Sequence, residues 1–179
     1  MEKYNILTPN PRFRVLPKTG QETSYATYDD GDFELGWKKG RHNSNNQTRF
    51  VAKTIAGNNV ILDYATRLMW SAADEAGGAV YTWANAVAHA QVTYNAVNGY
   101  AGFFDWRLPN IYELVSLLNF NVTDFKYTIF NFLTLLYQSS TTSPVNTANC
   151  IACRFGTLAG IVASNAKTSS LSIRICRSF

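Results

Sequence analysis

The spacing of hydrophobic and polar positions changes three times along the chain. Over residues 1–49, proline, glycine and asparagine recur at short intervals, which is typical of irregular structure. Val60-Ile61-Leu62 and Leu68-Met69-Trp70 are then short apolar runs on either side of a polar turn. Runs of this length separated by a turn predict a pair of strands.

The next segment has helical spacing. Thr82 can cap a helix, and Trp83, Val87 and Ala90 follow at intervals of four and three residues. These intervals predict a helix with the three side chains on one face. His89 on this helix is a surface or packed side chain on one interpretation and a catalytic base on the other.

A second helix is predicted after Pro109. Asn110 precedes it and Glu113 stands three residues further on, which is a variant of the capping box. Its apolar stripe is expected to pack in the core and consists of Ile111, Leu114, Leu117 and Leu118.

Beyond Thr128 the helical spacing ends and short strands are predicted at residues 137–142, 148–155, 161–163 and 171–177. In the last strand, inward side chains are expected to alternate with outward Ser172, Arg174 and Cys176. The order of strands, two helices and further strands predicts an α+β domain.

Composition narrows the class of protein. Hydrophobic residues make up 46% of the 179 residues and charged residues 16%, which is enough apolar material for one compact domain. The net charge of +4 is too small to indicate a nucleic-acid partner. No run is long enough for membrane insertion, and the first residues lack the apolar stretch of a secretory signal. No acidic residue follows Asp124, so the C-terminal third differs from the rest.

No cofactor or metal is expected. Cys150 and Cys153 have the spacing of a zinc or redox motif, but no second ligand pair accompanies them, and small, chemically incidental cysteines are the favoured interpretation. The acidic cluster at residues 29–34 suits a calcium loop in its ligand type but lacks the full spacing. A solvated acidic turn is the alternative for this cluster.

Several motifs together resemble one known family. Residues 102–110 read Gly-Phe-Phe-Asp-Trp-Arg-Leu-Pro-Asn and precede Glu113-Leu114. Asp63-x-x-Thr66-x-Leu68-Met69-Trp70 lies upstream, and residues 137–142 read Tyr-Gln-Ser-Ser-Thr-Thr, with Gln138 where the family usually has Trp. Over residues 17–178 the chain resembles the Lcl C-terminal domain family.

The resemblance implies a C-type lectin-like fold, with two helices, a small twisted, mostly antiparallel sheet, and terminal strands brought together. Residues 1–16 are then an N-terminal arm and residues 17–179 one domain. Asp105 and Arg107 are expected to form a structural pair beside an indole; a catalytic role would need a nucleophile or base that the spacing does not supply. The expected structural scaffold comprises Trp70, Trp83, Asp105, Trp106, Arg107 and Pro109.

Domains of this family also recur as variable proteins of diversity-generating retroelements. There, reverse transcription randomises adenines in template Asn codons and rewrites the C-terminal part of the gene. Such mutagenesis does not produce Trp, Gln, Glu, Met or Lys. Residues 1–138 contain 21 residues of these types, whereas residues 139–179 contain one, Lys167.

A variable region is therefore expected at about residues 130–177. Phe155 and Val162 are expected to face inward, whereas other side chains are expected on a ligand-binding face. The predicted ligand-binding positions are Leu133, Leu135, Asn149, Ile151, Cys153, Arg154, Gly156, Leu158, Ala159, Ile161, Ala163, Ser164 and Asn165.

The leading hypothesis is a non-enzymatic, ligand- or receptor-binding protein whose C-terminal surface a retroelement diversifies, in a virus (phage) or a cellular host. Its partner would be a protein or a glycan, and it could belong to a virion, a cell surface, a larger particle or a homo-oligomer. The alternative is an adhesin-type domain that binds glycan or glycosaminoglycan through Arg154, Lys167, Arg174 and Arg177. An enzyme related to formylglycine-generating enzymes is a third interpretation, against which the scattered cysteines argue.

Overall fold

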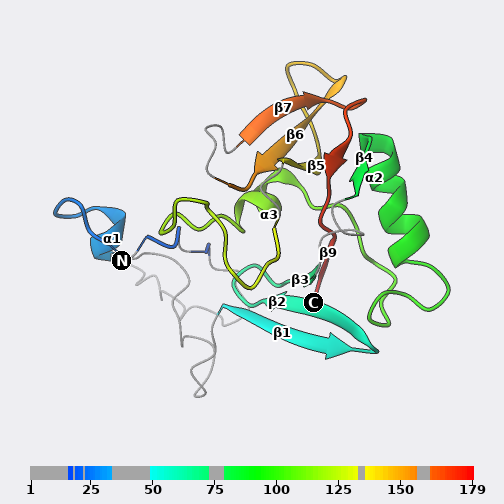
Figure 1. Cartoon of the computed structure of the whole chain (residues 1–179), viewed down its shortest axis with the longest axis horizontal. Helices are drawn as coiled ribbons and strands as arrows, with labels where there is room; N and C mark the ends of the chain where they lie inside the picture. Colours follow the sequence, from blue (N-terminus) through cyan, green and yellow to red (C-terminus); the bar gives the residue numbers. More distant parts are fainter. Residues whose placement is uncertain are drawn as a thin grey trace, which may run out of the picture.

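The computed structural model describes residues 16–17, 19–21, 23–33, 49–72, 79–132, 136–156 and 162–179. Within these ranges the chain is α+β, as predicted, but it forms two sheets and not one (Figure 1). The first sheet has the order β1-β2-β3-β9, with strands β1 (Phe50–Ile55), β2 (Asn58–Asp63), β3 (Leu68–Ser71) and β9 (Cys176–Ser178). The second has the order β4-β8-β5-β6-β7, with strands β4 (Val80–Tyr81), β5 (Leu136–Thr142), β6 (Asn149–Arg154), β7 (Val162–Ala166) and β8 (Leu171–Ser172).

The two central strands of the first sheet, β2 and β3, are buried on both faces over the residues that pair with each other. Strands β2 and β3 are the predicted pair, and their turn is at residues 64–67. Ile61 and Trp70 face one core cluster, together with Leu114 and Tyr137, whereas Val60 and neighbouring side chains of both strands face a second cluster around Trp106. Burial on both faces explains why these strands are continuous apolar runs without polar alternation. The C-terminal β9 pairs with β3, which confirms the expected meeting of early and late strands.

The first predicted helix is present as α2 (Trp83–His89), and a π-helical turn, η2 (Ala90–Tyr94), continues it. Of the three side chains predicted to share one face, Ala90 is buried and Trp83 half-buried, but Val87 is 36% exposed, and the buried face is completed by Ala86 and Tyr94. Small Ala86 and Ala90 allow the helix to approach the second core cluster closely, whereas Trp83 is only half-buried and donates its indole N–H to the Ser139 carbonyl oxygen at 2.9 Å.

The second predicted helix is α3 (Ile111–Val115), and its capping box is confirmed. The Asn110 side chain accepts from the Glu113 backbone N–H, and the Glu113 carboxylate accepts from the Asn110 backbone N–H. Leu114, Leu117 and Leu118 are buried in the first core cluster, as the spacing predicted. In Figure 1, α3 lies between the two sheets.

The predicted final strand was wrong in two respects. Residues 171–177 form two short strands, β8 and β9, that belong to different sheets. Ser172, Arg174 and Cys176 do not face outward, because all three are buried. Ile173 and Ile175 pack in the second core cluster, while the Arg174 guanidinium lies 4.4 Å from the Phe132 ring and donates to the Ser71 carbonyl oxygen. The connecting segment thus has core on both sides.

Carboxylates of the acidic cluster at residues 29–34 accept hydrogen bonds from backbone N–H groups of their own loop. Asp29 precedes α1 (Asp30–Phe33) and accepts hydrogen bonds from the backbone N–H groups of Tyr25 and Asp32. The Tyr25 bond is the main cause that lowers the pKa of Asp29. The carboxylate of Asp32 accepts from the Tyr28 backbone N–H. Of the predicted arm, residues 1–16, only Leu16 lies within the described residues.

Candidate ligand-binding site

The predicted binding positions that the structure describes lie on or beside β6 and β7, an antiparallel pair at the end of the second sheet (Figure 1). We refer to these two strands as the β6–β7 ribbon. Ile151 stands opposite Ser164 and Ala152 opposite Ala163. Residues directly opposite one another project from the same face of a sheet, and neighbours along a strand project from opposite faces. The register therefore assigns every ribbon residue to one of two faces.

One face is open along β7. We define the ligand face as the residues on this side that are exposed or partly exposed: Asn149, Ile151, Val162, Ser164 and Ala166. The Asn149 side-chain amide donates to the Ser164 hydroxyl at 3.1 Å, which ties the two strands together across this face. Asn149, Ile151 and Ser164 were predicted as binding residues, and the structure brings them together.

Two exposed members of this face were missed by the sequence interpretation. Val162 was expected to face inward, but its side chain is 50% exposed. Ala166 was not considered. Alternation counted from Ser164 in both directions would have found both positions, but the predicted strand ended at Ala163.

Two predicted binding residues are buried and cannot contact a ligand in this fold. Cys153 is 0% exposed because this part of the sheet face is covered by the first core cluster, where Cys153 packs with Tyr137 and Phe155. Gly156 is buried in the turn after β6, where its backbone N–H donates to the Asp124 carbonyl oxygen. The prediction that Phe155 faces inward is confirmed, since its ring stacks on Phe132 at a centroid distance of 3.9 Å.

Three further predicted residues project from the other face of the ribbon. Ala163 and Asn165 stand opposite Ala152 and Cys150, which are both buried, and Arg154 follows them at the end of β6. Each of the three is partly exposed. One continuous binding face made of all the predicted positions is thus geometrically impossible. Leu133, Leu135, Leu158, Ala159 and Ile161 lie outside the described residues.

The cations predicted for a glycosaminoglycan site do not gather into one patch. Arg174 is 0% exposed and cannot meet an external anion. Lys167 donates to the Thr142 hydroxyl at 2.8 Å and lies 4.1 Å from the Trp83 ring, while Arg177 lies 3.9 Å from the Phe103 ring. Lys167 and Arg177 are therefore held by contacts within the chain. Of the four predicted cations, Arg154 is the one that lies in a strand of the ribbon.

The predicted scaffold residues hold the ribbon on a dense core. Trp70 and Trp106 are 0% exposed, and Pro109 is buried. The Trp106 indole N–H donates to the Tyr100 carbonyl oxygen, and both its backbone N–H and its carbonyl oxygen bond to the Asn95 side chain. These contacts fix the loop that leads into α3.

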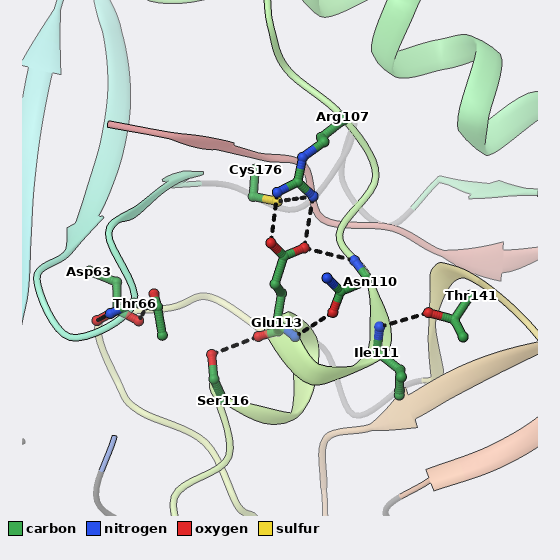
Figure 2. A network of polar contacts seen from close by, with 9 residues as sticks. All are labelled: Asp63, Thr66, Arg107, Asn110, Ile111, Glu113, Ser116, Thr141 and Cys176. Atoms are coloured by element: carbon green, nitrogen blue, oxygen red, sulfur yellow. Dashed lines mark hydrogen bonds and ion pairs between the residues drawn. The ribbon is translucent and has the colours of Figure 1, made fainter. Parts of the chain in front are cut away.

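Figure 2 shows the polar network that attaches α3 to both sheets. The Arg107 guanidinium donates to both carboxylate oxygens of Glu113, at 2.7 and 2.6 Å, and Ile111 N–H donates to the Thr141 hydroxyl of β5. Asp63 receives a bidentate pair from Arg49, at 2.9 and 2.7 Å, and also accepts from the Thr66 hydroxyl. Bidentate arginine–carboxylate pairs fix geometry as well as charge. This network makes the element beneath the second sheet rigid.

The predicted Asp105–Arg107 pair was wrong in its partners. Arg107 pairs with Glu113, whereas Asp105 accepts from Arg177 of β9 at 2.6 and 3.2 Å. Each of the two side chains therefore bonds to a different element: Arg107 to Glu113 of α3 and Asp105 to Arg177 of β9. Both residues keep the structural role that was predicted.

The Asp105–Arg177 pair leads to a titration prediction. The hydrogen bond from Arg177 is the main cause that lowers the pKa of Asp105. A carboxyl group whose pKa is lower in the folded than in the unfolded chain stabilises the fold at pH values above its unfolded pKa. This stabilisation is lost as the pH falls through the pKa of the folded state. Arg177→Gln is expected to raise the Asp105 pKa to its ordinary range, as measured by NMR titration of the carboxyl carbon. Lys167→Gln should leave that pKa unchanged, and an unaltered pKa in Arg177→Gln would refute the assignment.

The three cysteines are free and buried, in agreement with a chemically incidental role. Burial raises the pKa of the Cys153 thiol to about 12 and also raises that of Cys176. Because the thiolate is the reactive form, we expect labelling by Ellman's reagent at pH 8 to be at least about 100-fold slower in the native protein than in guanidinium. Fast reaction of even one thiol under native conditions would contradict this burial.

A cavity of about 300 Å³ lies beside α3, between Pro17, Thr66 and Asn110. It is lined by none of the predicted binding residues, and the Glu113 carboxylate at its wall is already bonded to Arg107.

Among the described residues, no three His, Cys, Asp or Glu side chains come together as a metal site. In the same part of the chain, no helix has the length and apolar character needed to cross a membrane.

Comparison with known proteins identifies a family. The sequence model of the Lcl C-terminal domain family matches residues 59–177, from β2 to β9. The matched region contains the β6–β7 ribbon, the second core cluster, the first core cluster except Phe50, and the network of Figure 2. No curated protein matches the chain significantly.

Proposed function

The chain belongs to the Lcl C-terminal domain family, and on this premise we propose that it is a non-enzymatic binding protein with a C-type lectin-like scaffold. Its ligand face is diversified by a retroelement and contacts a protein or glycan on another particle or cell. Binding arises from shape and hydrogen-bond complementarity, without covalent chemistry. Several copies acting together would raise the strength of attachment through avidity.

The observation that carries this proposal is the burial pattern of the ribbon. In β7, exposed and partly exposed residues alternate and none is buried. Its neighbour β6 has three buried residues, Cys150, Ala152 and Cys153. Side chains of β7 can therefore change without disturbing packed neighbours, while β6 joins them to the core. Binding residues supported by a rigid element are what a variable recognition surface requires.

The use of residue types supports diversification. Lys167 is the only residue after Gln138 of a type that adenine-directed mutagenesis of Asn codons does not produce. In the structure its ammonium group bonds to Thr142 and lies over Trp83, so it serves the scaffold and not the ligand face. The one exception in the segment is thus a residue with a structural task.

The test is the complete sequence of the surrounding locus. We expect a reverse transcriptase gene and a near-identical repeat of the 3′ part of this gene, differing only where the repeat has adenines. The structure adds a position-specific expectation: those adenines fall in codons of the ligand face, such as those for Ile151, Val162 and Ser164. A complete locus without such a repeat would exclude the proposal, as would differences concentrated in the codons of Ala152 and Phe155.

A further inference from the structure

Within the part of the chain that the structure describes, the outer side of β7 is an open sheet edge. β7 is the last strand in the order β4-β8-β5-β6-β7, and no other described strand pairs with it. Edge strands present a row of backbone N–H and C=O groups that can pair with another chain. The question is which of these groups point outward and what could satisfy them.

One hydrogen bond sets the direction of the backbone groups. The Lys167 N–H donates to the Ala148 carbonyl oxygen across the end of the ribbon. In an antiparallel ladder, hydrogen-bonded pairs alternate with pairs whose backbone groups point away. With the observed register, Asn165 and Ala163 bond toward β6, whereas the N–H and C=O groups of Val162 and Ser164 point to the free edge. The Ala166 N–H points the same way, while its carbonyl oxygen accepts from Ser169.

This edge lacks the features that usually prevent pairing. Proteins protect exposed edges with proline, charged side chains or bulges. Residues 162–166 read Val-Ala-Ser-Asn-Ala, with neither proline nor charge, and their register with β6 is uninterrupted. The outward donors and acceptors recur at every second residue, which is the spacing of another extended polypeptide.

We infer that β7 binds an extended segment of a partner protein as an added sixth strand of the second sheet. This inference rests on the proposed function and specifies its mode of recognition. Backbone hydrogen bonds do not depend on side-chain identity, so they persist when the ligand face is diversified. The main chain of β7 supplies a constant part of the affinity, and the varied side chains beside it select among sequences.

Charge favours a partner segment over a second copy of this chain. No acidic residue follows Asp124, whereas the same part of the chain carries Arg154 and Lys167 at opposite ends of the ribbon. Two copies paired through β7 would bring these like charges together, while a neutral or acidic segment meets no such repulsion. The partner segment is therefore expected to be extended, and neutral or acidic in charge.

The test uses a displayed library of random linear peptides of about ten residues, the length of a long strand with flanks. Peptides selected on the intact chain are measured against two variants. Ser164→Pro removes one outward N–H and places a ring at the edge, whereas Ser164→Thr keeps both the N–H and a hydroxyl. We expect at least about a tenfold loss of affinity in the first variant and a clearly smaller loss in the second, which keeps the backbone donor and adds only a methyl group to the ligand face.

Hydrogen exchange gives an independent readout on the unmodified chain. Without peptide, the amides of Val162 and Ser164 should exchange quickly and those of Ala163 and Asn165 slowly. Bound peptide should protect Val162 and Ser164. This pattern also decides the matter if Ser164→Pro does not fold.

Four outcomes would overturn strand addition. Three of them are no enrichment of linear peptides, enriched peptides that bind Ser164→Pro normally and leave the Ser164 amide unprotected, and protection that appears without peptide as the chain concentration rises. The last would show that a second copy occupies the edge. The fourth is peptide binding that is lost in Ile151→Ala but kept in Ser164→Pro, which would reject strand addition and retain the ligand face. Failure of the locus test alone would reject diversification and leave strand addition unaffected.

Discussion

Replacing Asp63 by alanine is expected to lower the free energy of unfolding by about 3–5 kcal/mol, because it leaves the Arg49 charge buried without its partner. Asp63 is 0% exposed, and its carboxylate accepts from the Arg49 guanidinium, the Ala65 backbone N–H and the Thr66 hydroxyl. Arg49 in turn donates to the Ser116 carbonyl oxygen after α3. One carboxylate thus joins the β2–β3 turn to the helix beneath the second sheet.

Chemical denaturation followed by tryptophan fluorescence measures this loss. Asp105→Ala is the matched control, because it also removes a bidentate partner of an arginine, but from a carboxylate whose side chain is 60% exposed. An exposed pair contributes at most about 1 kcal/mol. The assignment of Asp63 as the central structural carboxylate fails if the two variants lose equal stability.

The second large effect separates the ligand face from the scaffold within one cross-strand pair. Cys153 and Val162 stand directly opposite each other on β6 and β7, yet Cys153 is 0% exposed and Val162 is 50% exposed. Asparagine is the residue that the retroelement template would encode. Cys153→Asn buries an amide among aromatic rings and is expected to cost about 2–4 kcal/mol. Val162→Asn is expected to cost less than about 1 kcal/mol.

Thermal unfolding of the two variants beside the parent chain provides the measurement. A lower melting temperature for Cys153→Asn alone would place the boundary of tolerated variation between these two residues. If Val162→Asn unfolds the protein to the same extent, β7 is part of the core and cannot serve as a freely variable surface. This comparison of Cys153→Asn with Val162→Asn can be made without knowing the ligand.

Local structure could be predicted wherever the residues that stabilise it lie within a few positions of one another in the sequence. The capping box at Asn110 and Glu113 is satisfied by residues three apart, and the β2–β3 pair is separated by four turn residues. Both were therefore found. The partner of Arg107 was missed, because Asp105 and Glu113 are both close in sequence and only the turn into α3 decides between them.

The exposure of the predicted binding positions was anticipated only in part. Strands were correctly predicted near residues 148–155 and 161–163, although the second extends to Ala166, and the face on which each residue lies depends on the register between β6 and β7. Cys153 and Val162 project from the same face, and their exposure was interchanged because the first core cluster covers that face at Cys153 but not at Val162. The Arg174 error has a related cause: a charged residue in an alternating sequence is expected to face solvent, but its side chain lies over the Phe132 ring of the first core cluster and is buried there.

β9 is the fourth strand of the first sheet and follows the β6–β7 ribbon along the chain, so that sheet cannot be completed before the ribbon has been synthesised. The buried residues Ile173 to Cys176 also follow the ribbon. A frameshift or premature stop within residues 149–166 would remove all of them. Such a product would lack the strand that pairs with Met69 and Trp70 of β3. Under the proposed diversification, the position of β9 thus makes folding depend on an intact reading frame through the varied segment.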